Sequence, residues 1–313
     1  MEKTLCYIFA SLVAILTSQK CCTAQLTNLA TDQSSLLEMK AHIISDPSLT
    51  ITTNWSNSSS VCSWIGVTCG SRHRRVTALN LSDMGLLGSI PPQLGNLSFL
   101  VSLDLTSNNF SGTLPQELSR LCRLKFLSIE ENNFRGEIPS WLPFLPKLEY
   151  LSLRSNSFSG FIPKSISNLT NLYHLDFSFN SLEGIIPPEI GRLQRLQLLA
   201  IQSNNLTGII PSAIFNMSSL QILAFRANGL SGNLPNDLCA TLPFIQGIYL
   251  SLNELSGQIP SNLSQCSQIQ VLSLDTNSFS GPIPAAIGDL KSLQILQLSG
   301  NQLTGMLHFL YKS

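Results

Sequence analysis

The sequence has 313 residues, of which only 12% are charged, with 18 basic and 18 acidic side chains. No basic stripe is present to hold a nucleic-acid backbone or an anionic membrane by charge, so nucleic acid is excluded as a partner. The length allows two ordinary domains, but internal repeats override a prior that rests on length alone.

Residues 1–24 have the pattern of a secretory signal peptide. Lys3 precedes the apolar run LCYIFASLVAILT, small residues follow around CCTA, and we expect cleavage near Ala24. The apolar run is shorter than the roughly 20 residues that a membrane-spanning helix needs. An uncleaved anchor is the alternative. The signal-peptide pattern predicts that the chain enters the secretory pathway. No later segment of the sequence approaches a membrane span.

Residues 25–75 lie before the repeats and are predicted to cap them. The segment TDQSSLLEMKAHII offers a helix N-cap at Thr31 or Asp32. Its apolar residues are typical of a short amphipathic helix and are Leu36, Leu37, Met39, Ile43 and Ile44. The following segment, NWSNSSSVCSWIGVTC, carries two Trp and two Cys. SRHRRV (residues 71–76) is predicted to be a solvated turn, with an anionic docking site as the alternative.

From residue 76 to residue 307 one phrase repeats about ten times, and the last copy is incomplete. Each copy has Leu-x-Leu or a close variant, then Asn, then Leu or Phe two residues later and Gly four residues later. The Asn positions are 24 residues apart, apart from one insertion before Asn253. They are Asn108, Asn132, Asn156, Asn180, Asn204, Asn228, Asn253, Asn277 and Asn301. The first copy, LNLSDMGLLGSIP, has Met84 in place of the Asn.

Each part of the phrase predicts one part of a coil. Leu-x-Leu is a period-two fragment of a short strand, which is stable only when it is stacked in parallel on the next coil. The Asn amide can satisfy buried backbone groups where the chain turns inward, so the nine Asn are predicted to form a ladder. The Gly permits a bend, and a recurring Pro prevents a long helix on the return path. The predicted fold is therefore an α/β solenoid with short turns or 3₁₀ helices behind the sheet.

The pattern LxxLxxLxLxxNxLSGxIP resembles the plant-specific class of leucine-rich repeats, and residues 25–75 resemble the N-terminal cap of plant leucine-rich-repeat receptor kinases and receptor-like proteins. The resemblance implies a right-handed superhelix with a parallel sheet on its concave face. It also implies a disulfide between Cys62 and Cys69 of the cap. Residues 308–313 are expected to be an uncapped tail, and the chain is expected to be truncated before a transmembrane segment and a kinase.

Cys239 and Cys266 occupy similar places in successive repeats, so a second disulfide is predicted between them, with two inert buried thiols as the alternative. Cys122 would then be the odd thiol, in a packing role. The four His are scattered without metal-ligand spacing, and no nucleophile, phosphate-binding or kinase motif occurs. We therefore expect no enzyme activity, no metal and no cofactor.

The open face of the sheet is the candidate ligand-binding surface. The residues that flank and separate the two Leu of each strand face this side, and they include an aromatic and apolar column beside Arg and carboxylates. The candidates are Phe126, Glu130, Tyr150, Arg154, His174, Asp176, Leu198, Gln202, Ile222, Arg226 and Tyr249. The alternative is that bulky residues only stiffen the strands at these positions.

Nine Asn-x-Ser/Thr sequons occur, several of them because the repeat itself contains the pattern. Those expected to carry glycans are Asn54, Asn57, Asn96, Asn168, Asn205, Asn216 and Asn262. The other two are Asn80, which would face the concave sheet, and Asn109.

The sequence therefore predicts extracellular recognition of a peptide or protein on the concave face. The resemblance implies the ligand-sensing part of a plant receptor kinase in defence or developmental signalling, located in the apoplast or at the outer face of the plasma membrane. It also implies a co-receptor kinase ectodomain as a partner. The alternative is a secreted inhibitor similar to the polygalacturonase-inhibiting proteins, although those carry a Cys-containing C-terminal cap that this sequence lacks.

Overall fold

The computed structural model describes residues 27–304, which fall into two compact units. The first unit contains the residues up to 127 together with 141–148, and the second contains 128–140 and the residues from 149 onward. The predicted signal peptide (1–24), Gly305 of the last repeat and the predicted tail (308–313) lie outside the described residues.

The first unit holds the cap and the first repeats. Its helices are α2 (Leu29–Ala41), α3 (Thr50–Asn54), η2 (Val61–Ser63), η3 (Pro92–Asn96), η4 (Gln116–Arg120) and η5 (Leu142–Phe144). Its strands are β1 (Ile43–Ser45), β2 (Val67–Cys69), β3 (Val76–Asn80), β4 (Leu87–Gly88), β5 (Ser102–Asp104) and β6 (Asn109–Gly112). The cap strands β2 and β1 pair antiparallel with β3 and β4, and the repeat strands β3–β5 and β4–β6 pair in parallel. Strand β7 (Phe126–Ser128) spans the boundary between the units.

The second unit consists of stacked coils, each with two strands and one short helix. The main sheet is parallel and contains β9 (Tyr150–Ser152), β11 (His174–Asp176), β13 (Leu198–Ala200), β15 (Ile222–Ala224), β17 (Gly247–Tyr249), β19 (Val271–Ser273) and β21 (Ile295–Gln297). The second sheet is also parallel and contains β8 (Asn133–Glu137), β10 (Ser157–Phe161), β12 (Ser181–Ile185), β14 (Asn205–Ile209), β16 (Gly229–Asn233), β18 (Glu254–Gln258), β20 (Ser278–Pro282) and β22 (Gln302–Thr304).

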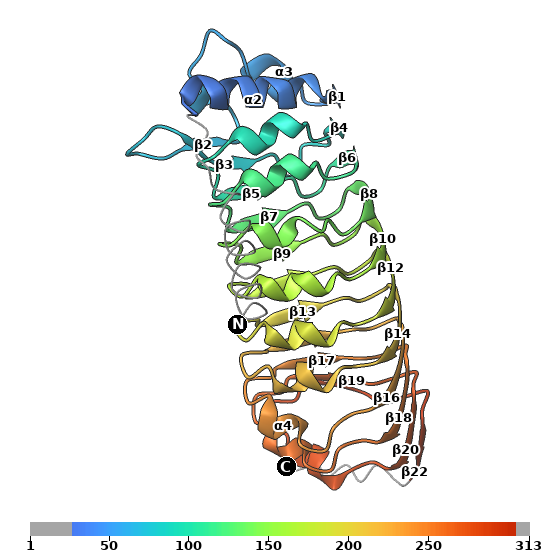
Figure 1. The fold of residues 1–313 in the computed structure, drawn as a ribbon. Helices are drawn as coiled ribbons and strands as arrows, with labels where there is room; N and C mark the ends of the chain where they lie inside the picture. The colour runs from blue at the N-terminus through green and yellow to red at the C-terminus, as the bar shows by residue number, and fades with distance from the viewer. Residues whose placement is uncertain (1–26, 305–313) are drawn as a thin grey trace, which may run out of the picture. The chain divides into compact units, whose positions relative to one another are not determined.

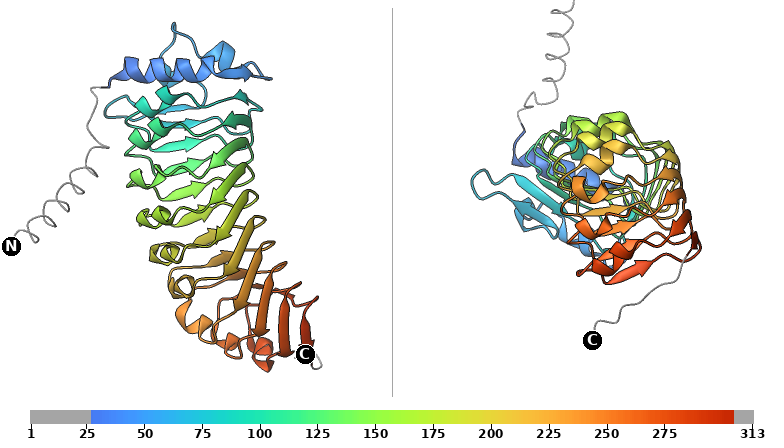
Figure 2. Two further views of the ribbon diagram at one scale, coloured as in Figure 1. Left: turned by 45° about the vertical axis from the view of Figure 1, so that its right-hand side comes forward. Right: turned by 90° about the horizontal axis from the view of Figure 1, so that it is seen from below.

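Short helices form the return path of the coils of the second unit, as the recurring Pro predicts. They are η6 (Lys164–Asn168), η7 (Pro188–Arg192), η8 (Ser212–Asn216), α4 (Leu238–Thr241), η9 (Leu263–Gln265) and η10 (Ala285–Asp289). Figure 1 shows them on a different side of each coil from the second-sheet strands β10, β12, β14, β16, β18, β20 and β22, and Figure 2 shows the strands of this unit lying side by side. The predicted solenoid architecture is confirmed.

The core of the second unit is built from the apolar residues of the repeat phrase. Up to the coil of Asn277, the side chains two residues after each ladder Asn of this unit are at most 1% exposed and are Phe134, Phe158, Leu182, Leu206, Leu230, Leu255 and Phe279. The Leu of the Leu-x-Leu fragments in these coils are buried in the same way, for example Leu175 and Leu199 at 0%. These coils therefore bury the same positions against their neighbours, as expected of repeats that are not stable alone.

The ladder asparagines tie each coil to the one before it. Asn180 Nδ2 donates to the carbonyl oxygens of Leu153, Phe177 and Ser178 at 3.0–3.2 Å, and Asn180 Oδ1 accepts from the backbone N–H of Phe158 at 2.9 Å. Asn156, Asn204, Asn253 and Asn277 repeat this pattern. The amide points into the bend and satisfies backbone groups of two coils at once.

The residue before each ladder Asn has a left-handed backbone, which the sequence does not reveal. Eight such residues are not Gly and have φ of 52–58°, and they are Ser107, Glu131, Ser155, Phe179, Ser203, Ala227, Leu252 and Thr276. Gly300 occupies the same place in the last repeat, with φ 64°. Because this conformation brings the β-carbon close to the backbone, non-Gly residues are strained here.

Replacing Ala227 with Gly is therefore expected to stabilise the protein by about 0.5–1 kcal/mol. The matched control is Ala286→Gly in η10, which has no positive φ and should lose about 0.5–1 kcal/mol. Chemical denaturation of both variants checks the prediction. Equal effects of the two substitutions would show that the backbone of Ala227 is not strained.

The repeat Gly residues also adopt positive φ. Gly184 has φ 76°, and a β-carbon there would lie 2.6 Å from the ring of Phe161 in the preceding coil. The position therefore requires Gly for its backbone conformation, as the predicted bend implies, whereas the exposed ring of Phe161 could shift to make room for a β-carbon.

Helix α2 differs from its prediction at both ends. Its N-cap is Asn28, whose side chain accepts from the backbone N–H of Thr31 at 3.0 Å, and not Thr31 or Asp32. The helix ends at Ala41, so Ile43 and Ile44 belong to β1, where Ile44 is 80% exposed. The N-cap lies earlier because Asn28 and Thr31 form a capping box, in which each side chain accepts from the backbone N–H of the other. The C-terminal difference arises because pairing of β1 with β4 overrides the local apolar pattern.

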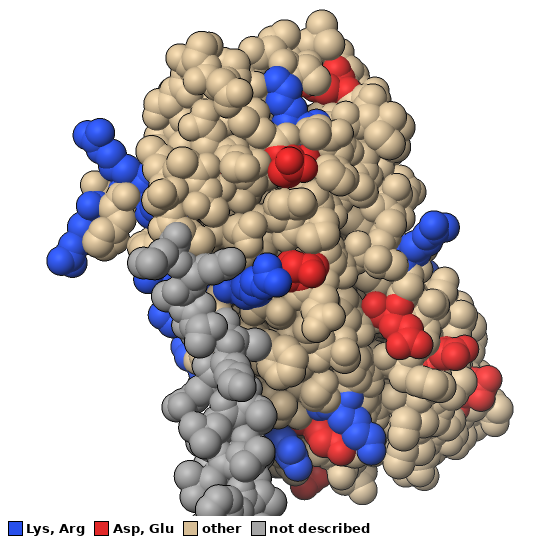
Figure 3. Space-filling view, turned by 45° about the horizontal axis from the view of Figure 1, so that its top comes forward, with Lys and Arg blue, Asp and Glu red and all other residues tan. Residues whose placement is uncertain are grey.

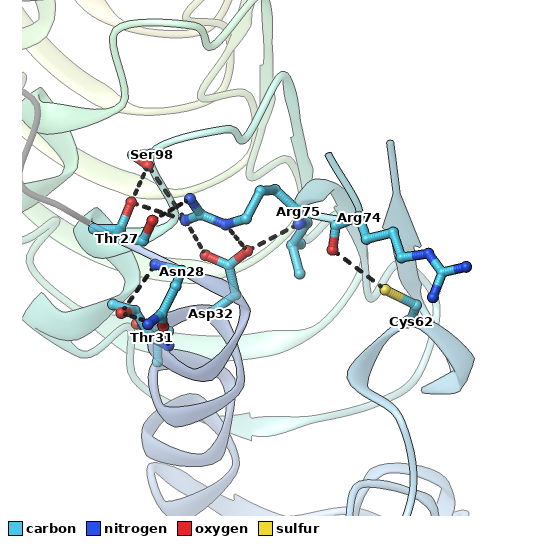
Figure 4. A network of polar contacts seen from close by, with 10 residues as sticks. Thr27, Asn28, Thr31, Asp32, Cys62, Arg74, Arg75 and Ser98 are labelled. Atoms are coloured by element: carbon cyan, nitrogen blue, oxygen red, sulfur yellow. Dashed lines mark hydrogen bonds and ion pairs between the residues drawn. The ribbon is translucent and has the colours of Figure 1, made fainter. Parts of the chain in front are cut away.

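The turn SRHRRV is not wholly solvated, because Arg75 is buried. Its guanidinium pairs with the carboxylate of Asp32 in α2, with Nε–Oδ2 and Nη2–Oδ1 distances of 2.7 and 2.6 Å. Arg75 also donates to the carbonyl and hydroxyl oxygens of Thr27, and the backbone N–H of Val76 donates to Asp32. Figure 4 shows this network, which joins the cap helix to the first repeat strand.

Two disulfides link the predicted pairs. Cys62 and Cys69 have an S–S distance of 1.99 Å, and Cys239 and Cys266 have 2.00 Å. Cys122 stands outside both and is half-buried. The bond between Cys239 and Cys266 joins α4 to the coil that follows it, and the alternative of two buried thiols is wrong.

The last described coil is less buried than those before it. Leu293, Leu296, Leu298 and Leu303 are half-exposed. The equivalent residues of the preceding coil are buried and are Ile269, Leu272, Leu274 and Phe279. Because exposed apolar patches tend to associate, we predict association or fraying of the chain after residue 290.

Candidate ligand-binding surface

The open face of the main sheet presents three columns of side chains. The first column holds the residue before the Leu-x-Leu fragment, the second holds its middle residue, and the third holds the residue that follows it. Strand register places the first column in direct succession, with His174 beside both Tyr150 and Leu198, and Ile222 beside Leu198 and Gly247. Parallel stacking therefore brings residues 24 positions apart into one continuous surface.

An aromatic and acidic cluster lies at the start of this surface. The rings of Tyr150 and His174 are stacked, with centroids 4.0 Å apart and planes 14° from parallel. The hydroxyl of Tyr150 donates to Glu130 Oε1 at 3.1 Å. Burial, and then the carboxylate of Glu130, raise the pKa of Tyr150 far above its usual value. Glu130 is half-buried, so this carboxylate is held against Tyr150 and does not simply extend into solvent.

His174 is neutral at neutral pH. Burial lowers the pKa of its imidazole, and the nearby carboxylates of Asp176 and Glu130 oppose this effect without cancelling it. The groups that face the ring are Tyr150 from β9, Asp176 from its own strand and Leu198 from β13.

The lowered pKa of His174 predicts a loss of stability in acid. The imidazole takes up a proton less readily in the folded than in the unfolded chain. The stability that neutral His174 contributes to the folded state is therefore lost as the pH falls from about 6.5 towards the folded pKa. In His174→Gln this part of the loss should be absent. Free energies of unfolding at pH 7.5, 6.0 and 5.0 check this, and an equal fall in both proteins would contradict it.

A second polar pair lies one column away. Arg154 Nη1 is 3.8 Å from Asp176 Oδ2, and the Arg154 guanidinium lies over the ring of Phe179 at 4.5 Å. Asp176 Oδ1 accepts from the backbone N–H of Ser178 at 2.8 Å, and Asp176 is only 8% exposed. The Arg154–Asp176 contact is longer than a hydrogen bond, so Oδ2 keeps the capacity to accept one from a ligand.

The next two coils are apolar in the first two columns and polar in the third. Leu198 and Ile222 are half-exposed, and Ala200 and Ala224 lie between them and the third column. Gln202 is half-exposed and Arg226 is exposed in the third column. Beyond them, the ring of Tyr249 lies against Gly247, where a β-carbon would be 2.7 Å from Tyr249 Cε2.

The structure therefore places ten of the eleven candidate residues in the second unit. The other, Phe126, is half-buried on β7 in the last strand residues of the first unit.

Sequence reasoning missed three features of this face. The ring of Tyr173, which is 40% exposed, lies edge-to-face with that of Tyr150, with centroids 6.3 Å apart. The ring of Phe179 lies beneath the guanidinium of Arg154. A hydrogen-bonded network also connects Ser251, Ser273, Asp275 and Gln297. The four residues of the network occupy the second and third columns, so their positions on this face could have been read from the sequence. Tyr173 and Phe179 lie next to the columns, and their ring contacts gave no sequence signal.

The sequons differ in exposure. Asn57, Asn168, Asn205 and Asn216 are exposed, whereas Asn54, Asn96 and Asn262 are half-buried. Asn262 Oδ1 is buried without a hydrogen-bond partner among the described residues. The four exposed Asn are the better glycosylation candidates, and modification at all seven stays a prediction.

Charged groups are sparse on the surface. Figure 3 shows acidic and basic side chains mostly as small separate groups on the face that it presents. Within residues 27–304, no three His, Cys, Asp or Glu side chains are grouped so as to hold a metal ion. Over the same range, no helix is both long and apolar enough to cross a membrane.

The stacked coils, the ladder and the cap define a leucine-rich-repeat protein with a plant-type N-terminal cap. Residues 29–70 match the leucine-rich-repeat N-terminal domain. Six stretches match the leucine-rich repeat, and these are 99–121, 123–145, 147–169, 171–193, 195–217 and 268–290.

The similar proteins are mainly plant receptor ectodomains. The chain is 41% identical over 101 residues to the LRR receptor-like serine/threonine-protein kinase EFR of Arabidopsis thaliana, which is 32% of this chain and 10% of that kinase. The ectodomain of GASSHO1/SCHENGEN3 from Arabidopsis thaliana, solved with CASPARIAN STRIP INTEGRITY FACTOR 2, has a TM-score of 0.80 and 41% identity. That match covers 87% of this chain and 33% of the ectodomain.

A plant ice-binding protein is also similar in structure, with a TM-score of 0.80 and 29% identity, covering 89% of this chain and 88% of that protein. The same solenoid therefore serves different binding tasks, and function has to be argued from the residues of the surface. The chain spans a tenth or less of the length of the curated receptor kinases that it matches first, and those kinases match it only through their repeats.

Proposed function

We propose that the main sheet of the second unit binds a peptide or protein ligand, as the ligand-sensing part of a plant receptor-kinase-like protein in defence or developmental signalling. The observation that carries this proposal is the cluster of Tyr150, His174, Glu130 and Asp176, which continues into apolar Leu198 and Ile222 on one sheet face. Aromatic anchors beside orienting charges are typical of surfaces that bind peptides.

The similar proteins also support a peptide-binding role for this surface. The receptor kinase HAESA, whose ectodomain has this fold, has been solved with a peptide hormone and, in one case, also with a co-receptor. A co-receptor kinase ectodomain is accordingly part of the proposal. We also propose an extracellular location, which the disulfides and the relatives support. Inhibition of a wall-degrading enzyme has no support from the similar proteins.

The proposal predicts that one face binds the ligand and the other does not. Leu198→Arg places a charge among the half-exposed apolar residues of the main sheet, and it should weaken binding at least about tenfold, equivalent to 1.4 kcal/mol or more. The probe is a peptide selected from a random dodecapeptide library against the wild-type protein, with affinity measured by biolayer interferometry.

The matched control is Ile185→Arg on the second sheet, where Ile185 is 61% exposed. This variant should bind as the wild type does. If Ile185→Arg lost binding while Leu198→Arg bound as the wild type does, the ligand would bind to the second sheet. A library that yields no binding peptide would contradict peptide recognition.

A further inference from the structure

We propose that the ligand is a peptide that lies extended across the main sheet, with a basic residue between Glu130 and Asp176 and an acidic residue at Arg226, three or four residues apart. This inference rests on the proposed function and adds to it the chemistry and spacing of the ligand.

The acidic end has acceptors that the protein does not use fully. Glu130 Oε1 receives the Tyr150 hydroxyl, whereas Oε2 receives no hydrogen bond from the described residues. Asp176 Oδ2 faces Arg154 at 3.8 Å, beyond hydrogen-bond distance. With His174 neutral, Glu130, Arg154 and Asp176 sum to a charge of −1. A guanidinium or ammonium has several donors and would bind such a pair of carboxylates in preference to an anion.

The surface between the two charged ends is apolar. Leu198, Ala200, Ile222 and Ala224 fill the first two columns of β13 and β15. No charged side chain interrupts these columns there, so a ligand carboxylate or ammonium placed on them would lose its hydration without a partner. The residue of the ligand that lies over these strands is therefore an apolar one.

The basic end is a single exposed guanidinium. Arg226 follows β15 in the third column and is exposed. It forms no ion pair within 4.0 Å among the described residues, in contrast to Arg154. A ligand carboxylate can meet the Arg226 guanidinium in a bidentate geometry, which would define the direction of the peptide.

The strand spacing sets the distance between the two ligand charges. Neighbouring strands are about 4.8 Å apart, so Asp176 on β11 and Arg226 after β15 are about 10 Å apart along the direction in which the strands stack. Strand β9, which carries the Tyr150 ring, is one strand further from Arg226. An extended peptide rises about 3.3 Å per residue. The basic and acidic residues of the ligand are therefore separated by three or four positions.

The test is a selection from the random dodecapeptide library against three proteins, the wild type, Arg226→Glu and the control Arg192→Glu. Arg192 is exposed on η7, on the return path of its coil, so its reversal changes the net charge equally. Wild type and Arg192→Glu should enrich Lys or Arg with Asp or Glu three or four residues away. Arg226→Glu should lose the acidic position and select a basic residue there.

A single selected peptide sharpens the test. Binding by Arg226→Glu should fall at least tenfold and return when the acidic residue of the peptide is replaced with Lys. Peptides that lose binding in Leu198→Arg but lack the charge pair would overturn this inference and leave the proposed function standing. If no selected peptide depends on Leu198, the proposed function fails too. Equal effects of both Arg reversals would show a long-range charge effect and would also overturn the inference.

Discussion

Replacing Asp32 with Ala is expected to lower the free energy of unfolding of the cap by about 3–5 kcal/mol, the range for breaking a buried ion pair. The Asp32 side chain is fully buried and that of Arg75 is 7% exposed. Without Asp32, the guanidinium of Arg75 would remain buried. Its remaining acceptors would be the carbonyl and hydroxyl oxygens of Thr27 and the hydroxyl of Ser98, 3.4 Å away. The backbone N–H of Val76 would also lose its acceptor.

A double-mutant cycle separates the pair from its surroundings. Asp32→Ala combined with Arg75→Ala should be less destabilised than the sum of the single variants, because no unpaired charge stays buried. The control is Lys164→Ala, whose exposed contact with Glu189 is 4.0 Å long and should contribute about 0–1 kcal/mol. Additive effects of the two cap substitutions, measured by urea denaturation, would show that the ion pair does not join α2 to β3.

Replacing Asn204 with Ala is expected to cost about 2–3 kcal/mol, since a buried group left without its hydrogen bond costs about 1–3 kcal/mol. Asn204 is 8% exposed. Its Nδ2 donates to the carbonyl oxygens of Phe177 and Ile201, and its Oδ1 accepts from the backbone N–H of Leu182 at 3.0 Å. The substitution therefore affects two neighbouring coils.

Amide hydrogen exchange identifies the cause of this loss. The amide of Leu182 should lose protection in Asn204→Ala, whereas the control Asn233→Ala should change stability by less than about 0.5 kcal/mol, because Asn233 is exposed on the second sheet. Unchanged exchange at Leu182 would mean that the ladder does not carry the stability of the stack.

The fold was predictable from the sequence because the repeat states the same physical requirement many times. Position 180 needs an Asn side chain for its hydrogen bonds to the backbone. Position 184 needs Gly because its backbone has a positive φ. Such requirements recur with the period and are visible without coordinates. The cap is not periodic, and the pairing of Arg75 with Asp32, 43 residues away, has no local signal.

The candidate surface was predictable only in part. The columns follow from the register of the strands, so Tyr150, His174 and Leu198 could be assigned to one face. Contacts between columns depend on rotamers and were not visible, as with Tyr150 and Glu130 or Arg154 and Phe179. The left-handed residues, such as Phe179 and Leu252, were missed because their types give no sign of positive φ.

The proposed function depends most on the main sheet being the surface that the ligand contacts. A photo-crosslinking residue placed at Gln202, in the third column, tests this directly with a library-selected peptide, and the same residue at the exposed Gln265 of η9 is the control. Crosslinks are expected from position 202 and none from position 265. Crosslinks from position 265 with none from position 202 would contradict ligand binding on the main sheet.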